Sequence, residues 1–168
     1  MSGSAGGAGE NSQGAFARAC RYLTARERCA SEVRTYLRKH GYADDEIESA
    51  IRLLQERRYV DDLRYARIYV ESRSRRAPRA GVLLVKELRR RGVDRETAQA
   101  AVEDFLRRVP EEELARRVIA KLPGEGEEWK ERAARRLRAR GFRPSIALRG
   151  QFEHEEAWDG IGGDEDAD

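Results

Sequence analysis

The chain has 168 residues, of which 39% are charged and only 7% are aromatic. So large a charged fraction leaves few side chains for a core, which favours small modules packed in a row over one large globule. No apolar run approaches the about 20 residues that a membrane helix requires. Two cysteines are too few for a disulfide framework. We therefore expect a cytoplasmic protein with no membrane partner.

The charge is unevenly distributed along the chain. The net charge is +3, but eight acidic residues and no Lys or Arg lie from Glu153 onward, so residues 1–152 carry a net +11. Residues 1–13 lack the basic start and apolar stretch of a secretory signal, and we predict disordered tails at 1–13 and 153–168. A basic body favours a polyanionic partner or an acidic protein surface, although arginine-rich helices also keep a protein soluble.

Apolar residues recur at helical spacing throughout the basic body, as at Ile47, Ala50, Ile51 and Leu54. We expect an all-α fold, in which three tandem three-helix repeats form an elongated array. The repeats cover residues 14–60, 61–109 and 110–152. Their expected helices are 14–27, 29–40 and 44–57; 62–76, 80–91 and 94–108; and 111–121, 126–140 and 143–152.

The repeat rests on three similar segments, LRKHGY (37–42), LRRRGV (88–93) and LRARGF (137–142). Each joins a leucine and a basic turn to a glycine and then an apolar residue, which is typical of a helix end closed by a left-handed glycine. Gly41, Gly92 and Gly141 are 51 and 49 residues apart, which indicates an internal repeat. The third copy is weaker, because Pro144 falls at the start of its last helix.

The adjacent acids of YVDDLRYA (59–66) pose the question of catalysis. We interpret Asp61 and Asp62 as a helix start, where a carboxylate accepts free backbone N–H groups, and Asp94 likewise. A catalytic or metal site would require further acids or histidines nearby, but the only histidines are His40 and His154, and neither lies in a ligand-spaced motif. We expect no catalytic residue, no metal site, no cofactor and no enzymatic activity.

Basic residues form the candidate binding site for a filament or nucleic acid. Arg73, Arg75, Arg76 and Arg79 fall within seven residues that contain no acid, and Pro78 should end the helix among them. The other candidates flank helix ends: Arg34, Arg38, Lys39, Lys86, Arg89, Arg90, Arg91, Arg135, Arg136, Arg138 and Arg140. Stacked repeats would present such residues as a stripe, which suits a long polymer. Arginines at helix ends also simply stabilise the helix dipole, by about 0.3–1 kcal/mol each.

Aromatic residues offer a second kind of contact. The six tyrosines could stack nucleic-acid bases, but their helical spacing favours core packing for most of them: Tyr22, Tyr36, Tyr42, Tyr59, Tyr65 and Tyr69. Trp129 shares a stripe with Ala133 and Leu137 and is expected in the core.

The stretches YVDDLRYA, RAGVLLVKELRRRGVD (79–94) and RRLRARGF (135–142) together resemble the RecX family of recombinase regulators, over about residues 15–150. The resemblance implies a curved all-α chain that acts as a monomer. It also implies a ligand of RecA filaments on single-stranded DNA that modulates, most simply by inhibition, recombination, ATP hydrolysis and the SOS response in DNA repair. The chain departs from the family pattern at Cys29, where Ser is common, and at Tyr36, where Lys or Arg is usual.

Two other functions fit the same residues. A stand-alone helix-turn-helix module would bind naked duplex with sequence preference, whereas the resemblance implies a preference for recombinase-coated single strands. A helical adaptor would bind a protein alone, and its binding would survive high salt.

Overall fold

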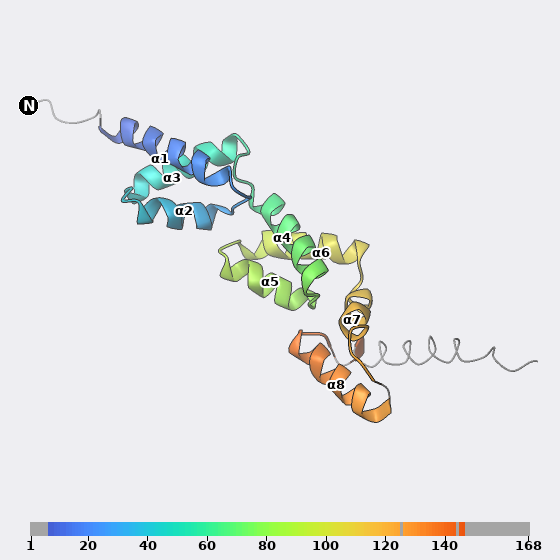
Figure 1. Ribbon diagram of the computed structural model, residues 1–168. Coiled ribbons are helices and arrows are strands. Elements are labelled where there is room, and N and C mark those ends of the chain that lie inside the picture. Colours follow the sequence, from blue (N-terminus) through green and yellow to red (C-terminus); the bar gives the residue numbers. More distant parts are fainter. Residues whose placement is uncertain (1–6, 125, 144, 147–168) are drawn as a thin grey trace, which may run out of the picture. The chain divides into compact units, whose positions relative to one another are not determined.

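The computed structural model describes residues 7–124, 126–143 and 145–146 (Figure 1). In this part of the chain every regular element is helical, which confirms the all-α prediction. The structure defines eight helices here: α1 (Gly7–Leu23), α2 (Ala30–Lys39), α3 (Asp44–Glu56), α4 (Asp62–Arg76), α5 (Gly81–Arg90), α6 (Arg95–Arg108), α7 (Glu111–Ile119) and α8 (Gly126–Ala139).

Helix boundaries agree with expectation except in α1. This helix begins at Gly7 rather than at residue 14, so it takes in residues that the sequence assigned to a disordered tail. Extending a helix that packing has already nucleated costs little per residue, which explains the difference. The helix ends at Leu23 rather than at residue 27, where the Thr24 hydroxyl donates to the Arg21 carbonyl at 2.8 Å.

The ninth expected helix, 143–152, and the tail at 153–168 lie largely outside the described residues. The described residues group into two compact units. The first unit comprises residues 1–69 and 87–101, and the second comprises residues 70–86 and 102–168, so that α4, α5 and α6 each contribute to both.

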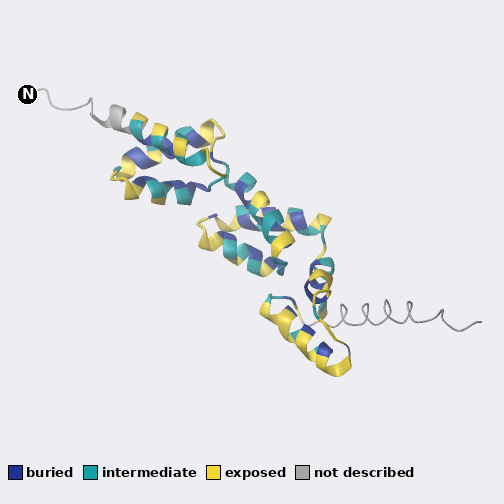
Figure 2. Ribbon diagram, viewed as in Figure 1, coloured by how far each residue is buried: buried dark blue, intermediate teal, exposed yellow. Residues whose placement is uncertain are grey.

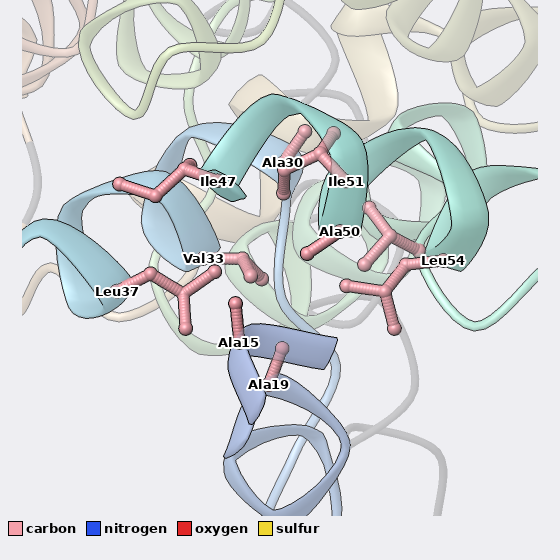
Figure 3. Packing of buried hydrophobic residues seen from close by; sticks show 10 residues of the cluster. Ala15, Ala19, Ala30, Val33, Leu37, Ile47, Ala50, Ile51 and Leu54 are labelled. Carbon is pink, nitrogen blue, oxygen red and sulfur yellow. The ribbon is translucent and has the colours of Figure 1, made fainter. Parts of the chain in front are cut away.

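The core of the first unit joins α1, α2 and α3, which pack on one another. Ala15 and Ala19 of α1 face Val33 of α2 and Leu54 of α3, with further apolar side chains around them (Figure 3). The buried positions follow the helical stripes read from the sequence, and the opposite faces of these helices are exposed (Figure 2).

In the second unit, α7 packs against α8. Leu114 and Ile119 of α7 are buried, as are Trp129 and Leu137 of α8. The core position expected for Trp129 is therefore confirmed, and its indole N–H donates to the Leu122 carbonyl at 3.3 Å.

The three glycine-closed helix ends share one geometry. Gly41, Gly92 and Gly141 have φ of +82°, +88° and +81°, the left-handed conformation that other residues adopt only at a cost. The backbone N–H of the residue after each glycine donates to the carbonyl five residues earlier: Tyr42 to Leu37, Val93 to Leu88 and Phe142 to Leu137, at 3.4, 3.2 and 3.2 Å. This is the double-bonded closure known as the Schellman motif, as the sequence predicted.

The acids at helix starts act as caps. Asp61 accepts the Arg64 N–H and Asp94 accepts the Thr97 N–H, each at 2.9 Å. Asp62 does something that the sequence did not indicate. Its carboxylate accepts the N–H of Ala30, the first residue of α2, at 2.8 Å. Burial raises the pKa of Asp62.

A second long-range cap repeats the first. In the second unit the Glu111 carboxylate accepts the N–H of Gly81, the first residue of α5, at 2.6 Å. The neighbouring contacts recur as well. The Cys29 thiol donates to the Arg91 carbonyl at 3.2 Å, and the Ala80 N–H donates to the Arg140 carbonyl at 3.0 Å.

We call each of these two sets of contacts a joint. Each joint ties the start of one helix to the acid that opens a later helix and to the end of a third helix. The first joint lies within the first unit and holds α2. The second lies within the second unit and holds α5.

Candidate polyanion-binding surfaces

The segment with the densest positive charge spans the end of α4 and the loop that follows it. α4 continues through Arg76, and the chain leaves the helix before Pro78, as expected. Arg75 and Arg76 are exposed, whereas Arg73 and Arg79 are half-buried. The four arginines, all in the second unit, therefore divide into two exposed and two half-buried side chains.

In the second unit Arg73, Arg79 and Arg136 lie near enough to Arg140 to repel its guanidinium, and we call these four residues the arginine cluster. Burial lowers the pKa of Arg140, and the positive charges of Arg136, Arg79 and Arg73 lower it further. Arginine nonetheless stays protonated at neutral pH. The mutual repulsion of these groups would be relieved by a bound anion, so the cluster is suited to phosphate or carboxylate.

Local bonds fix the cluster to the joint described above. The Arg140 guanidinium donates to the Pro78 carbonyl at 3.0 Å, while its own backbone carbonyl accepts the Ala80 N–H. Arg140, the residue directly after α8, and the loop that carries Arg79 are thereby held side by side. Arg136 lies in the last turn of α8 and is exposed.

A second basic surface lies in the first unit, beside α2. Lys39, Arg90 and Arg91 line a cleft of about 360 Å³ together with Tyr22 and Tyr36. The Arg91 guanidinium donates to the Tyr65 hydroxyl at 3.3 Å and lies 4.7 Å from the centre of the Tyr69 ring. Its position is therefore set by side chains of α4.

Two predicted site residues are paired with acids of their own unit. Arg34 donates to both oxygens of Glu48 at 2.7 and 3.0 Å, and this hydrogen bond lowers the pKa of Glu48. Arg38 donates to Asp44 at 2.8 Å. Their charges are partly offset, which makes them weaker candidates for a polyanion. The remaining predicted residues are exposed: Lys86, Arg89, Arg135 and Arg138.

The tyrosines divide between core and surface. Tyr65 is 3% exposed, as a core residue should be, whereas Tyr59 is 50% exposed, so the core expectation is wrong for it. Tyr59 directly follows the turn that ends α3, where the helical spacing no longer applies. Sequence reasoning missed the stack of Tyr22 on Tyr36, with ring centroids 3.8 Å apart. The two lie on different helices, so no local pattern marks them.

Comparison with known proteins decides the family. The chain matches the models of the first three-helix domain of RecX over residues 15–53 and of the second three-helix domain of RecX over residues 61–102. A regulatory protein RecX of Treponema pallidum (strain Nichols) is 32% identical over 133 residues, covering 78% of this chain and 79% of that protein. The chain belongs to the RecX family. Its curated relatives are named regulatory proteins.

Other relatives extend the likeness. A regulatory protein RecX of Halalkalibacterium halodurans is 27% identical over 159 residues, and the match covers 89% of this chain but 60% of that longer protein. The crystal structure of RecX from Lactobacillus salivarius superposes with a TM-score of 0.78 at 20% identity, covering 88% of this chain and 99% of that one. That likeness supports the fold. Among the described helices, none combines the length and apolar character that crossing a membrane demands.

Proposed function

We propose that this RecX-family protein binds RecA recombinase filaments on single-stranded DNA and inhibits recombination, ATP hydrolysis and SOS signalling without catalysing a reaction. The observation that carries the proposal is the arginine cluster, in which three guanidinium groups repel that of Arg140. A bound anion would offset this repulsion, and a nucleoprotein filament supplies both phosphates and carboxylates.

The proposed architecture is a curved, elongated array of three tandem repeats at residues 14–60, 61–109 and 110–152. It is supported by the three identical helix closures and by the two equivalent joints, Asp62 to Ala30 and Glu111 to Gly81. A repeat array suits a polymer, because equivalent side chains recur at intervals along it.

In the proposed mechanism the arginines bridge subunits of the filament and the strand that they enclose. A planar guanidinium donates two parallel hydrogen bonds to a phosphate or a carboxylate, so the same side chain can hold either partner. A ligand fixed in this way would block rearrangement or growth of the filament. We propose that the protein does so as a cytoplasmic monomer, with Arg75, Arg76, Arg89, Arg135 and Arg138 as additional contacts.

The decisive experiment compares binding to three targets: a RecA filament on single-stranded DNA, bare single strands, and bare duplex. Changing Arg73, Arg79 and Arg136 together to Ala should weaken filament binding and flatten its dependence on salt, because fewer counterions are then released. Arg140 is left in place because it holds the Pro78 loop. The control changes the exposed cations Arg52, Arg95 and Lys121 to Ala, which removes the same charge elsewhere.

Unchanged filament binding by the cluster variant would refute the proposed contact surface. Tighter, sequence-dependent binding to bare duplex than to the filament would favour a stand-alone DNA-binding module instead. Binding that is indifferent to salt would favour a protein adaptor.

A further inference from the structure

The cleft beside α2 differs from the arginine cluster in having an aromatic wall. Tyr22 of α1 and Tyr36 of α2 stack with an interplanar angle of 2°, and both line the cleft. The Arg28 guanidinium lies 4.1 Å from the centre of the Tyr22 ring, and the His40 ring lies 4.2 Å from that of Tyr36. The His40 ring is tilted by 46° from the Tyr36 ring, so Arg28, Tyr22 and Tyr36 form one column of planar groups, which we call the stacked column, and His40 packs against its Tyr36 end.

The two ends of the stacked column differ in access. The Arg28 side chain is largely buried, with 15% of its surface exposed, whereas His40 is exposed. A planar ligand can therefore reach the stacked column only at its Tyr36 end, which lines the cleft. Histidine, tyrosine and arginine planes are the groups on which proteins stack unpaired bases.

The cleft also holds positive charge next to this wall. Lys39 and Arg90 are exposed at its rim, and Arg91 lines it as well. The one acid in the lining, Glu32, lies 2.8 Å from Arg26, 3.8 Å from Arg91 and 4.0 Å from Arg28, so neighbouring guanidiniums offset its charge. Ser31 and Thr35 also line the cleft, where the Thr35 hydroxyl donates to the Ser31 carbonyl at 2.9 Å.

The cleft and the arginine cluster occupy equivalent places in successive repeats. The spacings of 51 and 49 residues that relate the three closing glycines also relate Tyr22 to Arg73, Arg28 to Arg79 and Arg91 to Arg140. Arg73 thus stands where the preceding repeat carries the Tyr22 ring, while the other two pairs keep an arginine. A polymer that repeats both charged and planar groups along its chain could bind the arginine cluster through its charges and the stacked column through its planar groups.

We propose that the cleft binds one nucleotide of an unpaired nucleic-acid strand, with its base against the stacked column and its phosphate at Lys39, Arg90 and Arg91. This rests on the proposed function for the presence of a strand, and it adds a base-contacting site in the first unit. A duplex does not fit the same site, because its bases are already stacked on each other. An acidic peptide would satisfy the cations but would leave the column without a partner.

Photo-crosslinking gives the first test, with the full chain and a thymidine oligonucleotide that carries 5-iododeoxyuridine. Excitation should link the base to the peptide that contains Tyr36 or His40, identified by mass spectrometry. Crosslinks found only in the second unit or in the tail would overturn the proposal. Because filament binding is measured separately, such a result would leave the proposed function standing.

Affinity measurements separate the base from the phosphate. His40→Ala and Tyr36→Leu should each weaken binding of the thymidine oligonucleotide by roughly tenfold, with an unchanged salt dependence, since stacking carries no charge. Lys39→Ala combined with Arg90→Ala should instead lower the slope of log affinity against log salt by about 0.7, for one phosphate contact on a single strand.

Arg52→Ala combined with Arg95→Ala is the matched control, because it removes two exposed charges of the same unit away from the cleft. This control should leave the slope of log affinity against log salt unchanged. His40 is exposed, so its variant keeps the test valid if Tyr36→Leu fails to fold. The His40 variant should lose affinity for the oligonucleotide but not for a polyglutamate peptide. Equal losses for both would overturn the proposal, because the stacked column would then not contact a base.

Discussion

The carboxylate of Asp62 accepts the backbone N–H of Ala30, 32 residues earlier in the chain, at 2.8 Å. The acid that opens α4 therefore caps α2. The Glu111 carboxylate serves Gly81 in the same way at 2.6 Å. An acid that the sequence marks as a simple helix start thus also joins two helices.

Removing this cap should destabilise the first unit. We expect Asp62→Ala to lower the free energy of unfolding by about 1 kcal/mol, because the Ala30 N–H loses its acceptor. Urea denaturation followed by circular dichroism measures the change. Asp45→Ala is the control, since Asp45 is an exposed acid of the first turn of α3 and should cost less. Equal effects of the two substitutions would contradict the long-range cap.

The pH dependence of Asp62 and Asp94 should have opposite signs. Burial raises the pKa of Asp62, so on raising the pH the unfolded chain loses this proton before the native state does. The contribution of Asp62 to the free energy of unfolding should therefore fall as pH rises from about 4 through the raised pKa. Hydrogen bonds from Thr97 lower the pKa of Asp94, so its contribution should be present above about 4 and be lost on acidification. Unfolding free energies of Asp62→Asn and Asp94→Asn, each compared with the unchanged chain across this range, provide the measurement. Curves of the same sign would refute the assignment.

The closing glycines should differ in their tolerance of alanine. At Gly92 an added Cβ would lie 2.2 Å from the Ser31 hydroxyl oxygen, whereas at Gly41 nothing lies within 4 Å. Both substitutions strain a left-handed residue, by about 1–2 kcal/mol, but Gly92→Ala must also displace the start of α2, at a further cost of about 1–3 kcal/mol. Denaturation of the two variants tests this. In a double-mutant cycle, Ser31→Gly should recover part of the loss at Gly92 and none at Gly41.

The two cysteines should react at different rates with a thiol reagent. Cys29 is buried, its thiol donates to the Arg91 carbonyl, and burial raises its pKa, so little thiolate is available. Cys20 is partly exposed. We expect one fast and one slow equivalent with a disulfide reagent under native conditions, and two fast equivalents in denaturant. The variant Cys20→Ser should lose only the fast native phase, and two fast native phases would show that the joint opens readily.

The arginine cluster should make the protein more stable in the presence of multivalent anions. Pyrophosphate that binds only the folded state raises the free energy of unfolding by about 2.7 kcal/mol at a hundred times its dissociation constant. Thermal unfolding with added pyrophosphate should show this shift at constant ionic strength. Arg79→Ala combined with Arg136→Ala should remove most of it, while Arg52→Ala combined with Arg95→Ala should not. A shift that persists in the cluster variant would place the anion elsewhere.

The sequence alone determined the helices and how they end. Helical stripes such as Ile47 to Leu54 and the glycine closures depend on contacts within a few residues, so their signals lie in adjacent letters. The start of α1 escaped prediction because a helix propagates from a packed segment through residues that carry no signal of their own.

Only the tertiary structure decided which distant groups meet. It selected Arg73, Arg79, Arg136 and Arg140 from a longer set of cations, joined Asp62 to Ala30, and stacked Tyr22 on Tyr36. These groups lie on different helices, and their approach depends on how whole apolar faces pack rather than on any spacing along one helix. Charge and residue type therefore predicted the candidate binding residues, while the packing of the helices determined which of them lie together.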